Sequence, residues 1–270
     1  MTPPQVVASG VVLHVVELDG LRPERLAYGR DLSVDERVRA ARLRSDLDRE
    51  RFVLRRGVLR RLLAEEMGES PAGLRFAFGP YGKPRLEGVG PCFSASSSGS
   101  LFVVAIAHAG EVGVDVERVV PREELDAMAR DHFPRVVRAR FAALGEGERL
   151  AAFYRIWTIE EAVAKLDGRG IADGMPVPDV AIAAMRADGR WDLPAAATHG
   201  PCAVETTRLG GDAVVSVAWE RELPSGRDGP SARSRLERRA TSVPAAAIRS
   251  APSTARDDPR RTLRRPVPRA

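Results

Sequence analysis

The amino-acid sequence predicts an α+β fold. Strand-like runs of alternating or β-branched apolar residues occur at residues 11–18, 74–78, 93–99, 101–107, 111–117, 204–208 and 213–219. Runs with helical apolar spacing lie at residues 34–44, 46–67, 122–131, 134–143 and 145–167. Strands followed by helices, twice along the chain, are typical of this class. With 270 residues, of which 44% are apolar, the chain can bury one large core or two smaller ones.

The first two helical segments are rich in arginine. Ser33 offers an N-cap, and Asp35 and Glu36 offer an acidic first turn, for the helix predicted at residues 34–44. Six arginines crowd the faces that the apolar residues leave open: Arg37, Arg39, Arg55, Arg56, Arg60 and Arg61. We expect a solvated surface for most of them, with a minority facing an anionic ligand.

Polar turns interrupt the strands that follow. Residues 79–82 (Gly-Pro-Tyr-Gly) form a turn signal, so Lys83 comes directly after a glycine-rich turn. The serines at residues 94–98 begin in a strand and lead to a polar turn, where hydroxyl and N–H groups can receive phosphate oxygens, although such runs are more often ordinary loops. We expect residues 101–107 and 111–117 to pair as antiparallel neighbours across a short turn.

The strand at residues 111–117 carries two carboxylates on one face. Val114 and Val116 fall on one side, and Asp115 and Glu117 on the other, roughly 6.5–7 Å apart. An amphipathic strand with its acids in water would explain this pattern. If Glu161 joins the two acids, three hard oxygen ligands would instead suit Mg²⁺.

The long helix predicted at residues 145–167 has two stripes. An apolar seam should pack into a core: Ala152, Ile156, Ile159, Val163 and Leu166. A second stripe contains Phe153, Trp157, Glu161 and Lys165, each four residues from the next. Because a solvated face seldom carries Phe and Trp, we interpret this stripe as the wall of a cleft with a carboxylate and an ammonium inside it.

Lysine is nearly absent from the chain. Of 42 basic residues only Lys83 and Lys165 are lysines. A coding bias would explain the abundance of arginine, and two lysines can survive by chance. Their retention nevertheless favours positions where a compact ammonium does what a planar guanidinium cannot.

The C-terminal residues 223–270 differ from the rest in composition. They hold twelve Arg against four acidic residues, a net charge of +8, which leaves −3 for residues 1–222. They are rich in Pro, Ser, Ala and Arg and contain no aromatic residue, so we expect a disordered tail. Its arginines allow weak non-specific attraction to nucleic acid, but no binding motif supports a nucleic-acid partner.

The remaining composition excludes several classes. Cys92 and Cys202 make no disulfide framework, and neither lies near other Cys or clustered His at metal-ligand spacing. The N-terminus lacks a signal-peptide pattern, and no apolar run reaches the length of a transmembrane helix. The sequence therefore predicts a cytoplasmic protein without a membrane partner.

Four motifs, in this order and at these separations, resemble the Sfp-type 4′-phosphopantetheinyl transferases over residues 10–220. They are Gly82-Lys83-Pro84, residues 93–99 (Phe-Ser-Ala-Ser-Ser-Ser-Gly), residues 113–117 (Gly-Val-Asp-Val-Glu) and residues 157–165 (Trp-Thr-Ile-Glu-Glu-Ala-Val-Ala-Lys). The resemblance implies a pseudo-symmetric pair of halves, about 1–117 and 118–222, followed by the tail at 223–270. It also implies an enzyme that moves the phosphopantetheine arm of coenzyme A onto a serine of an apo acyl or peptidyl carrier protein, releasing 3′,5′-ADP.

The same resemblance assigns roles to residues. Asp115, Glu117 and Glu161 would hold Mg²⁺, and Glu161 would also take the proton from the incoming serine. Lys165 would stabilise the leaving nucleotide. The coenzyme A contacts would come from Arg39, Lys83, Pro84, Ser96, Ser97, Asp115 and Lys165. A single pseudo-symmetric chain would suffice, so a monomer is expected.

Two residues depart from the family pattern. Ser97 stands where relatives usually have a histidine that contacts the 3′-phosphate, and Glu160 stands where a lysine is common. Both changes make the surroundings of an anionic substrate less positive. The alternative function is therefore a non-catalytic relative that binds coenzyme A or a carrier protein without turnover.

Overall fold

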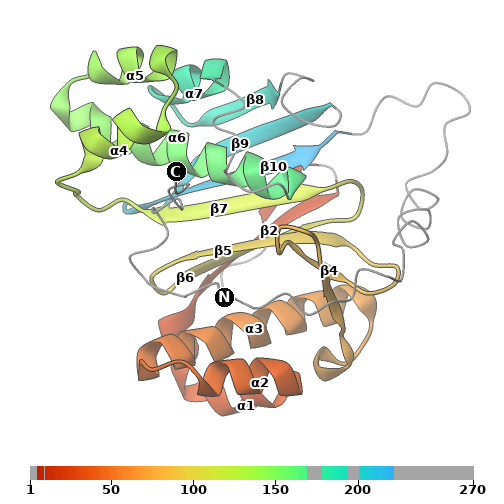
Figure 1. Ribbon diagram of the computed structural model, residues 1–270. Coiled ribbons are helices and arrows are strands. Elements are labelled where there is room, and N and C mark those ends of the chain that lie inside the picture. The colour runs from red at the N-terminus through yellow and green to blue at the C-terminus, as the bar shows by residue number, and fades with distance from the viewer. Residues whose placement is uncertain (1–4, 9, 169–177, 194–200, 222–270) are drawn as a thin grey trace, which may run out of the picture. The chain divides into compact units, whose positions relative to one another are not determined.

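The computed structural model describes residues 5–8, 10–168, 178–193 and 201–221 (Figure 1). Within them the chain forms two compact units. The first unit contains the residues up to Val16, residues 78–84 and the described residues from Cys92 onward, and the second contains residues 17–77 and 85–91. The tail predicted at residues 223–270 lies outside the described residues.

The strands of the first unit form two four-stranded sheets. One has the order β1-β2-β6-β5 and the other the order β7-β10-β9-β8. Their bounds are β1 (Gln5–Ala8), β2 (Val11–Glu17), β5 (Cys92–Ser98), β6 (Leu101–Ala107), β7 (Val112–Arg118), β8 (Gly189–Leu193), β9 (Cys202–Leu209) and β10 (Ala213–Glu220). The pairs β1–β2, β5–β6, β7–β10, β9–β10 and β8–β9 are antiparallel.

Apolar residues from both sheets share one core. Every residue of β6 is buried, and Val114 and Val116 of β7 belong to the same cluster as Val103 of β6. The two-residue period of a strand places Asp115 and Glu117 on the opposite face of β7. The alternation predicted for this strand is therefore confirmed.

The antiparallel pairing predicted between residues 101–107 and 111–117 is wrong. β6 lies between β2 and β5, so both of its edges are already occupied. β7 instead begins the second sheet and pairs with β10, where Ser216 stands opposite Asp115. A short turn between two apolar strands is typical of a hairpin, but it also lets the chain step from one sheet to the other when both strands share a core.

Helix α6 (Glu146–Asp167) crosses one face of the second sheet (Figure 1). The remaining helices of this unit are α4 (Leu125–His132), α5 (Arg135–Ala142) and α7 (Pro178–Ala184). All five residues of the predicted seam are buried, and Ile159 and Val163 share a cluster with Val204 and Ala218 of the sheet. The helix ends at Gly168, whose φ of 68° is left-handed. Together the helices and antiparallel sheets confirm the α+β class.

Phe153 and Trp157 line no cleft, contrary to the prediction. Their exposed fractions are 0% and 1%. Phe153 contacts Phe133 and Phe141 at ring-centroid distances of 5.5 and 6.4 Å, and it stacks on Trp157 at 5.8 Å. Helices α4 and α5 contact this part of α6, so the stripe begins in an aromatic core and only its last two members, Glu161 and Lys165, remain for a site.

The second unit is mainly helical. Its described elements include the 3₁₀ helices η1 (Leu18–Glu24) and η2 (Pro71–Gly73) and the helices α1 (Arg25–Arg30), α2 (Val34–Ala41) and α3 (Asp46–Met67). Of the short strands β3 (Phe76–Phe78) and β4 (Pro84–Leu86), residues 76–77 and 85–86 belong to this unit. The predicted N-cap is confirmed, because Ser33 Oγ accepts a hydrogen bond from Glu36 N and Ser33 N donates to the Glu36 carboxylate.

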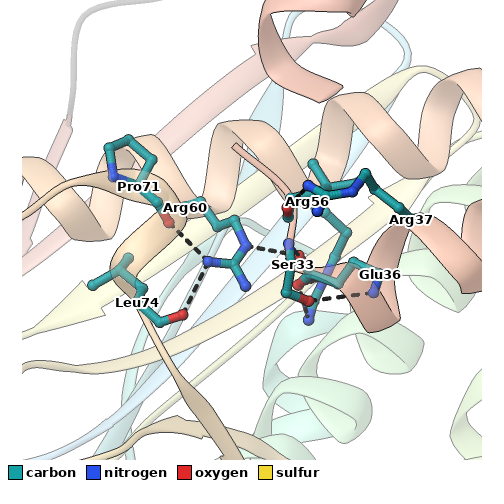
Figure 2. A network of polar contacts seen from close by, with 8 residues as sticks. Ser33, Glu36, Arg37, Arg56, Arg60, Pro71 and Leu74 are labelled. Carbon is teal, nitrogen blue, oxygen red and sulfur yellow. Dashed lines mark hydrogen bonds and ion pairs between the residues drawn. The ribbon is translucent and has the colours of Figure 1, made fainter. Parts of the chain in front are cut away.

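Arg60 is buried, although most arginines of these helices were expected to form a solvated surface. Its Nε donates to Glu36 Oε2 at 2.7 Å, and its NH1 donates to the carbonyl oxygens of Pro71 at 2.7 Å and Leu74 at 3.0 Å (Figure 2). Arg56 NH2 lies 2.8 Å from the other oxygen of Glu36. One side chain of α3 therefore joins α2, the first residue of η2 and Leu74, which follows η2.

Replacing Arg60 with methionine should lower the free energy of unfolding by about 2 kcal/mol, because two carbonyl oxygens lose their donor while Glu36 keeps Arg56. Urea unfolding of the purified variant measures the loss. The matched control is R25M, an arginine-to-methionine change at the first residue of α1, which should change stability by less than about 0.5 kcal/mol. An equal loss in both variants would contradict the role given to Arg60.

No helix among the described residues is long and apolar enough to cross a membrane. Within these residues, neither Cys92 nor Cys202 forms a disulfide.

Candidate active site

The candidate site forms where α6 touches β7. A Cβ atom on Gly113 would lie 2.0 Å from the carbonyl oxygen of Ala162 and 2.4 Å from the backbone nitrogen of Leu166, so the helix rests directly on the glycine. This close approach is possible only without a side chain. It brings Glu161 and Lys165, on the last turns of α6, to the polar face of β7.

Asp115 is the centre of the contacts. It is 3% exposed, and its Oδ1 accepts hydrogen bonds from Lys165 Nζ at 2.6 Å and from Ser96 Oγ at 2.7 Å. Lys165 Nζ also donates to Ser96 Oγ at 3.0 Å. Residues from β5, β7 and α6, predicted separately from the sequence, thus meet in one triangle of hydrogen bonds.

The neighbouring serines of β5 also point at β7. Ser94 Oγ accepts a hydrogen bond from the backbone nitrogen of Val114 at 3.1 Å. Ser98 Oγ accepts from the backbone nitrogen of Arg118 at 3.0 Å and donates to Glu117 Oε2 at 2.7 Å. Because β5 and β7 are edge strands of their sheets, these hydroxyls satisfy N–H groups that no strand covers. The contacts of Ser94 and Ser98 with β7 were not predicted, although the two-residue spacing that these serines share with Ser96 was the signal.

The carboxylates of the site repel one another in a poorly hydrated place. Burial and then the charge of Asp115 raise the pKa of Glu117 to about 8, against the opposing effects of Ser98, Lys165 and Arg122. Burial and the same aspartate raise the pKa of Glu161 to about 8, and Lys165 opposes this rise. Each of these two carboxyl groups therefore gains or loses its proton at a pH close to neutral.

The site favours the charged form of Lys165, whereas it favours the neutral form of the two glutamates. Burial alone would lower its pKa, but the charges of Asp115 and Glu161 and the hydrogen bond to Asp115 outweigh burial, so the pKa lies above its ordinary value. The ammonium is therefore charged at neutral pH and is fixed beside the carboxylates.

These raised pKa values predict a pH dependence of stability. Between the ordinary glutamate pKa of 4.5 and about 8, the folded protein holds protons on Glu117 and Glu161 that the unfolded chain has released. Their contribution is therefore present in full at low pH and is lost as the pH rises through about 8. Urea unfolding in EDTA from pH 5 to 8.5 should show this loss, and E161Q should reduce it. A pH dependence unaffected by E161Q would contradict the interpretation.

The donor set fits a hard divalent cation. Asp115 Oδ2 is buried and has no hydrogen-bond partner among the described residues, and the acids that interact with it, Glu117 and Glu161, offer only oxygen ligands. Among the described residues, however, no group of three or more His, Cys, Asp or Glu side chains is already gathered closely enough to hold a metal ion. The inference of a divalent-cation site therefore depends on the oxygen donors of these acids and on the unpartnered Oδ2 of Asp115.

Lys83 lies elsewhere in the first unit, with its ammonium already bonded. Its Nζ donates to Glu111 Oε2 at 2.8 Å and to the carbonyl oxygens of Val112 and Leu166, both at 3.0 Å. Leu166 belongs to the last turn of α6 and Val112 begins β7. Lys83 therefore joins the end of α6 to the start of β7, a contact that was not predicted from the sequence.

The other predicted contacts are less concentrated. Pro84 follows Lys83 directly and begins β4. Ser97 pairs with Phe102 of β6, and strand alternation turns it away from the face that carries Ser96. Arg39 belongs to the second unit, where its guanidinium lies 5.5 Å from the centroid of the Phe52 ring.

Comparisons with known proteins identify the family. Residues 111–218, which hold Asp115, Glu117, Glu161 and Lys165, match the model of the 4′-phosphopantetheinyl transferase superfamily. The chain is 35% identical over 164 residues to slr0495 of Synechocystis sp., which carries the name putative 4′-phosphopantetheinyl transferase; the match covers 58% of this chain and 66% of that protein.

Two further relatives extend the comparison. The chain is 30% identical over 176 residues to the 4′-phosphopantetheinyl transferase HetI of Nostoc sp., covering 63% of this chain and 74% of HetI. It is 23% identical to Sfp of Bacillus subtilis over 65% of this chain and 76% of Sfp. The matches thus span about two thirds to three quarters of these relatives, and they include the strand and the helix that form the site. The chain belongs to the 4′-phosphopantetheinyl transferase superfamily.

Proposed function

We propose that this protein transfers the 4′-phosphopantetheine arm of coenzyme A to a serine of an apo acyl or peptidyl carrier protein. The observation that carries the proposal is the hydrogen-bonded triangle of the buried Asp115 with Ser96 and Lys165. Transfer of a phosphoryl-type group to a hydroxyl needs a positioned acceptor for the proton and cations that offset charge on the phosphate oxygens.

Each group has a role in the proposed reaction. The serine oxygen of the carrier forms a bond to the phosphorus next to the pantetheine, and the bond from that phosphorus to the nucleotide breaks, which releases 3′,5′-ADP. Glu161, in the deprotonated form that becomes populated as the pH approaches about 8, takes the serine proton. Lys165, held by Asp115 and Ser96, binds the phosphate that leaves with the nucleotide.

Asp115, Glu117 and Glu161 would hold Mg²⁺ in this proposal, with the unpartnered Oδ2 of Asp115 as one ligand. When bound, the ion would supply positive charge to the phosphate oxygens. The position of Lys165 and the raised pKa of Glu161 do not depend on the ion. Asp115 and Ser96 hold Lys165, and burial and the charge of Asp115 raise the pKa of Glu161. We further propose that the protein acts as a monomer in the cytoplasm, in keeping with the absence of a disulfide among the described residues.

The decisive test is incubation of the purified protein with coenzyme A, Mg²⁺ and an apo carrier protein, followed by intact-mass measurement of the carrier. Transfer adds the mass of one phosphopantetheine arm to the carrier, and replacing its acceptor serine with alanine abolishes the gain. Tight coenzyme A or carrier binding without a mass gain, over a panel of acyl and peptidyl carriers, would instead identify the protein as a non-catalytic relative.

A further inference from the structure

A second cation, Arg122, reaches the same helix beyond the end of β7. Its Nε donates a hydrogen bond to the hydroxyl of Tyr154 at 2.9 Å, and that hydroxyl donates to the carbonyl oxygen of Val120 at 3.0 Å. Tyr154 lies on α6 and is completely buried. The tyrosine thus fixes both the loop after β7 and one edge of the guanidinium.

The direction of α6 places Arg122 at the Glu117 end of the carboxylates. Gly113 contacts the end of the helix at Leu166, Asp115 contacts Lys165, and the loop beyond Glu117 reaches back to Tyr154, so the helix runs antiparallel to the strand. Tyr154 and Glu161 are seven residues apart, which puts them on one face of the helix. The charge of Arg122 accordingly helps to lower the pKa of Glu117 against the effect of burial.

The outer edge of the guanidinium is free. Within the part of the chain that the structure describes, neither NH1 nor NH2 of Arg122 makes a hydrogen bond or an ion pair. Lys165, by contrast, already donates to Asp115 and Ser96. A free pair of guanidinium N–H groups has the geometry to bind two oxygens of one phosphate.

We propose that Arg122 binds the phosphate of coenzyme A that is joined to the pantetheine. The inference rests on the proposed function, in which Lys165 binds the neighbouring phosphate at the Asp115 end. Lys165 and Arg122 would then each bind one phosphate of the diphosphate, with Lys165 at the Asp115 end of the site and Arg122 at the Glu117 end. The half-buried position of Arg122 favours a small ligand inside the site over an acidic side chain of the carrier protein.

The test is titration calorimetry, with Mg²⁺ present, of coenzyme A and of 3′,5′-ADP, which lacks the phosphate on the pantetheine side. R122Q should weaken coenzyme A binding about tenfold and change the affinity for 3′,5′-ADP less than about twofold. Y154F keeps the guanidinium but loses its support, so it should weaken coenzyme A binding about threefold. R122K, which keeps the charge without the planar fork, should recover part of the loss.

The matched control is R118Q. Arg118 lies on the same strand end, but its guanidinium already pairs with Asp212 and with Ser100, so the same substitution should leave both affinities unchanged. Thermal unfolding of each variant establishes that it is folded. Equal losses for the two ligands, or none for either, overturn the proposal. An increase in the KM for the carrier protein alone would assign Arg122 to the carrier instead.

The outcomes separate this inference from the proposed function. If the wild-type protein neither binds coenzyme A nor loads a carrier, the proposed function fails and the role of Arg122 falls with it. If the wild-type protein binds coenzyme A and R122Q binds it equally well, only the role of Arg122 is wrong.

Discussion

Asp115→Asn should lower the turnover number by about a thousandfold, since the substitution removes the charge that organises the site. The carboxylate receives both the ammonium of Lys165 and the hydroxyl of Ser96, and it supplies the only buried side-chain oxygen of the site that lacks a partner among the described residues. Asparagine preserves the volume and one acceptor, so the fold should persist. The loss should therefore appear in turnover rather than in protein yield.

Single-turnover loading of an apo carrier protein at saturating coenzyme A and Mg²⁺ measures this effect. The matched control is D212N, the same change at an exposed aspartate that pairs with Arg118, and it should retain wild-type turnover. Calorimetric unfolding, repeated over a range of pH values, should also show that D115N lowers the pKa of Glu161. The reason is that the charge of Asp115 contributes to raising that pKa. Near-wild-type turnover in D115N would make the assignment of this carboxylate wrong.

Elements with strong periodicity were predictable from the sequence. Residues 145–167 have a continuous seam of apolar residues at helical spacing, and the helix forms at Glu146–Asp167. The alternation of Val114 and Val116 with Asp115 and Glu117 likewise specified the two faces of β7, because one face had to be buried. A local apolar pattern is therefore enough to predict an element when one face must be buried, because only one assignment of residues to the two faces is then possible.

Relations between elements were not predictable in the same way. The sequence does not say whether the strand at residues 111–117 pairs with the preceding strand or enters another sheet, since both arrangements bury the same apolar face. Nor does it say where along α6 the stripe of Phe153 and Lys165 passes from core to site, because α4 and α5 determine that limit. Lys83 shows the same difficulty: its partners Glu111 and Leu166 are distant in sequence.

No pattern in the sequence predicted the contact between Gly113 and α6. A single added methyl group would disrupt it. Gly113 was part of the recognised motif, but neither its neighbours in β7 nor its place in the strand indicates that a helix lies against it. In the structure a Cβ would stand 2.0 Å from the Ala162 carbonyl oxygen and 3.0 Å from the Cα of Leu166, both backbone atoms that cannot rotate away. An alanine here must therefore displace the helix or the strand.

Gly113→Ala should lower the free energy of unfolding by about 3 kcal/mol and turnover by about a hundredfold, because overpacking strains the core and α6 must withdraw by about 1 Å from the strand that carries Asp115. Urea unfolding and carrier loading measure the two losses. The matched control is G147A, in the first turn of α6, where a Cβ would meet nothing within 4 Å. That variant should retain turnover and gain up to about 1 kcal/mol, since alanine favours a helix over glycine. If G113A is as stable and as active as the wild-type protein, α6 does not rest on Gly113, and the distance between Lys165 and Asp115 must be set by other contacts, of which the Lys83 bridge to Leu166 and Val112 is the first to test.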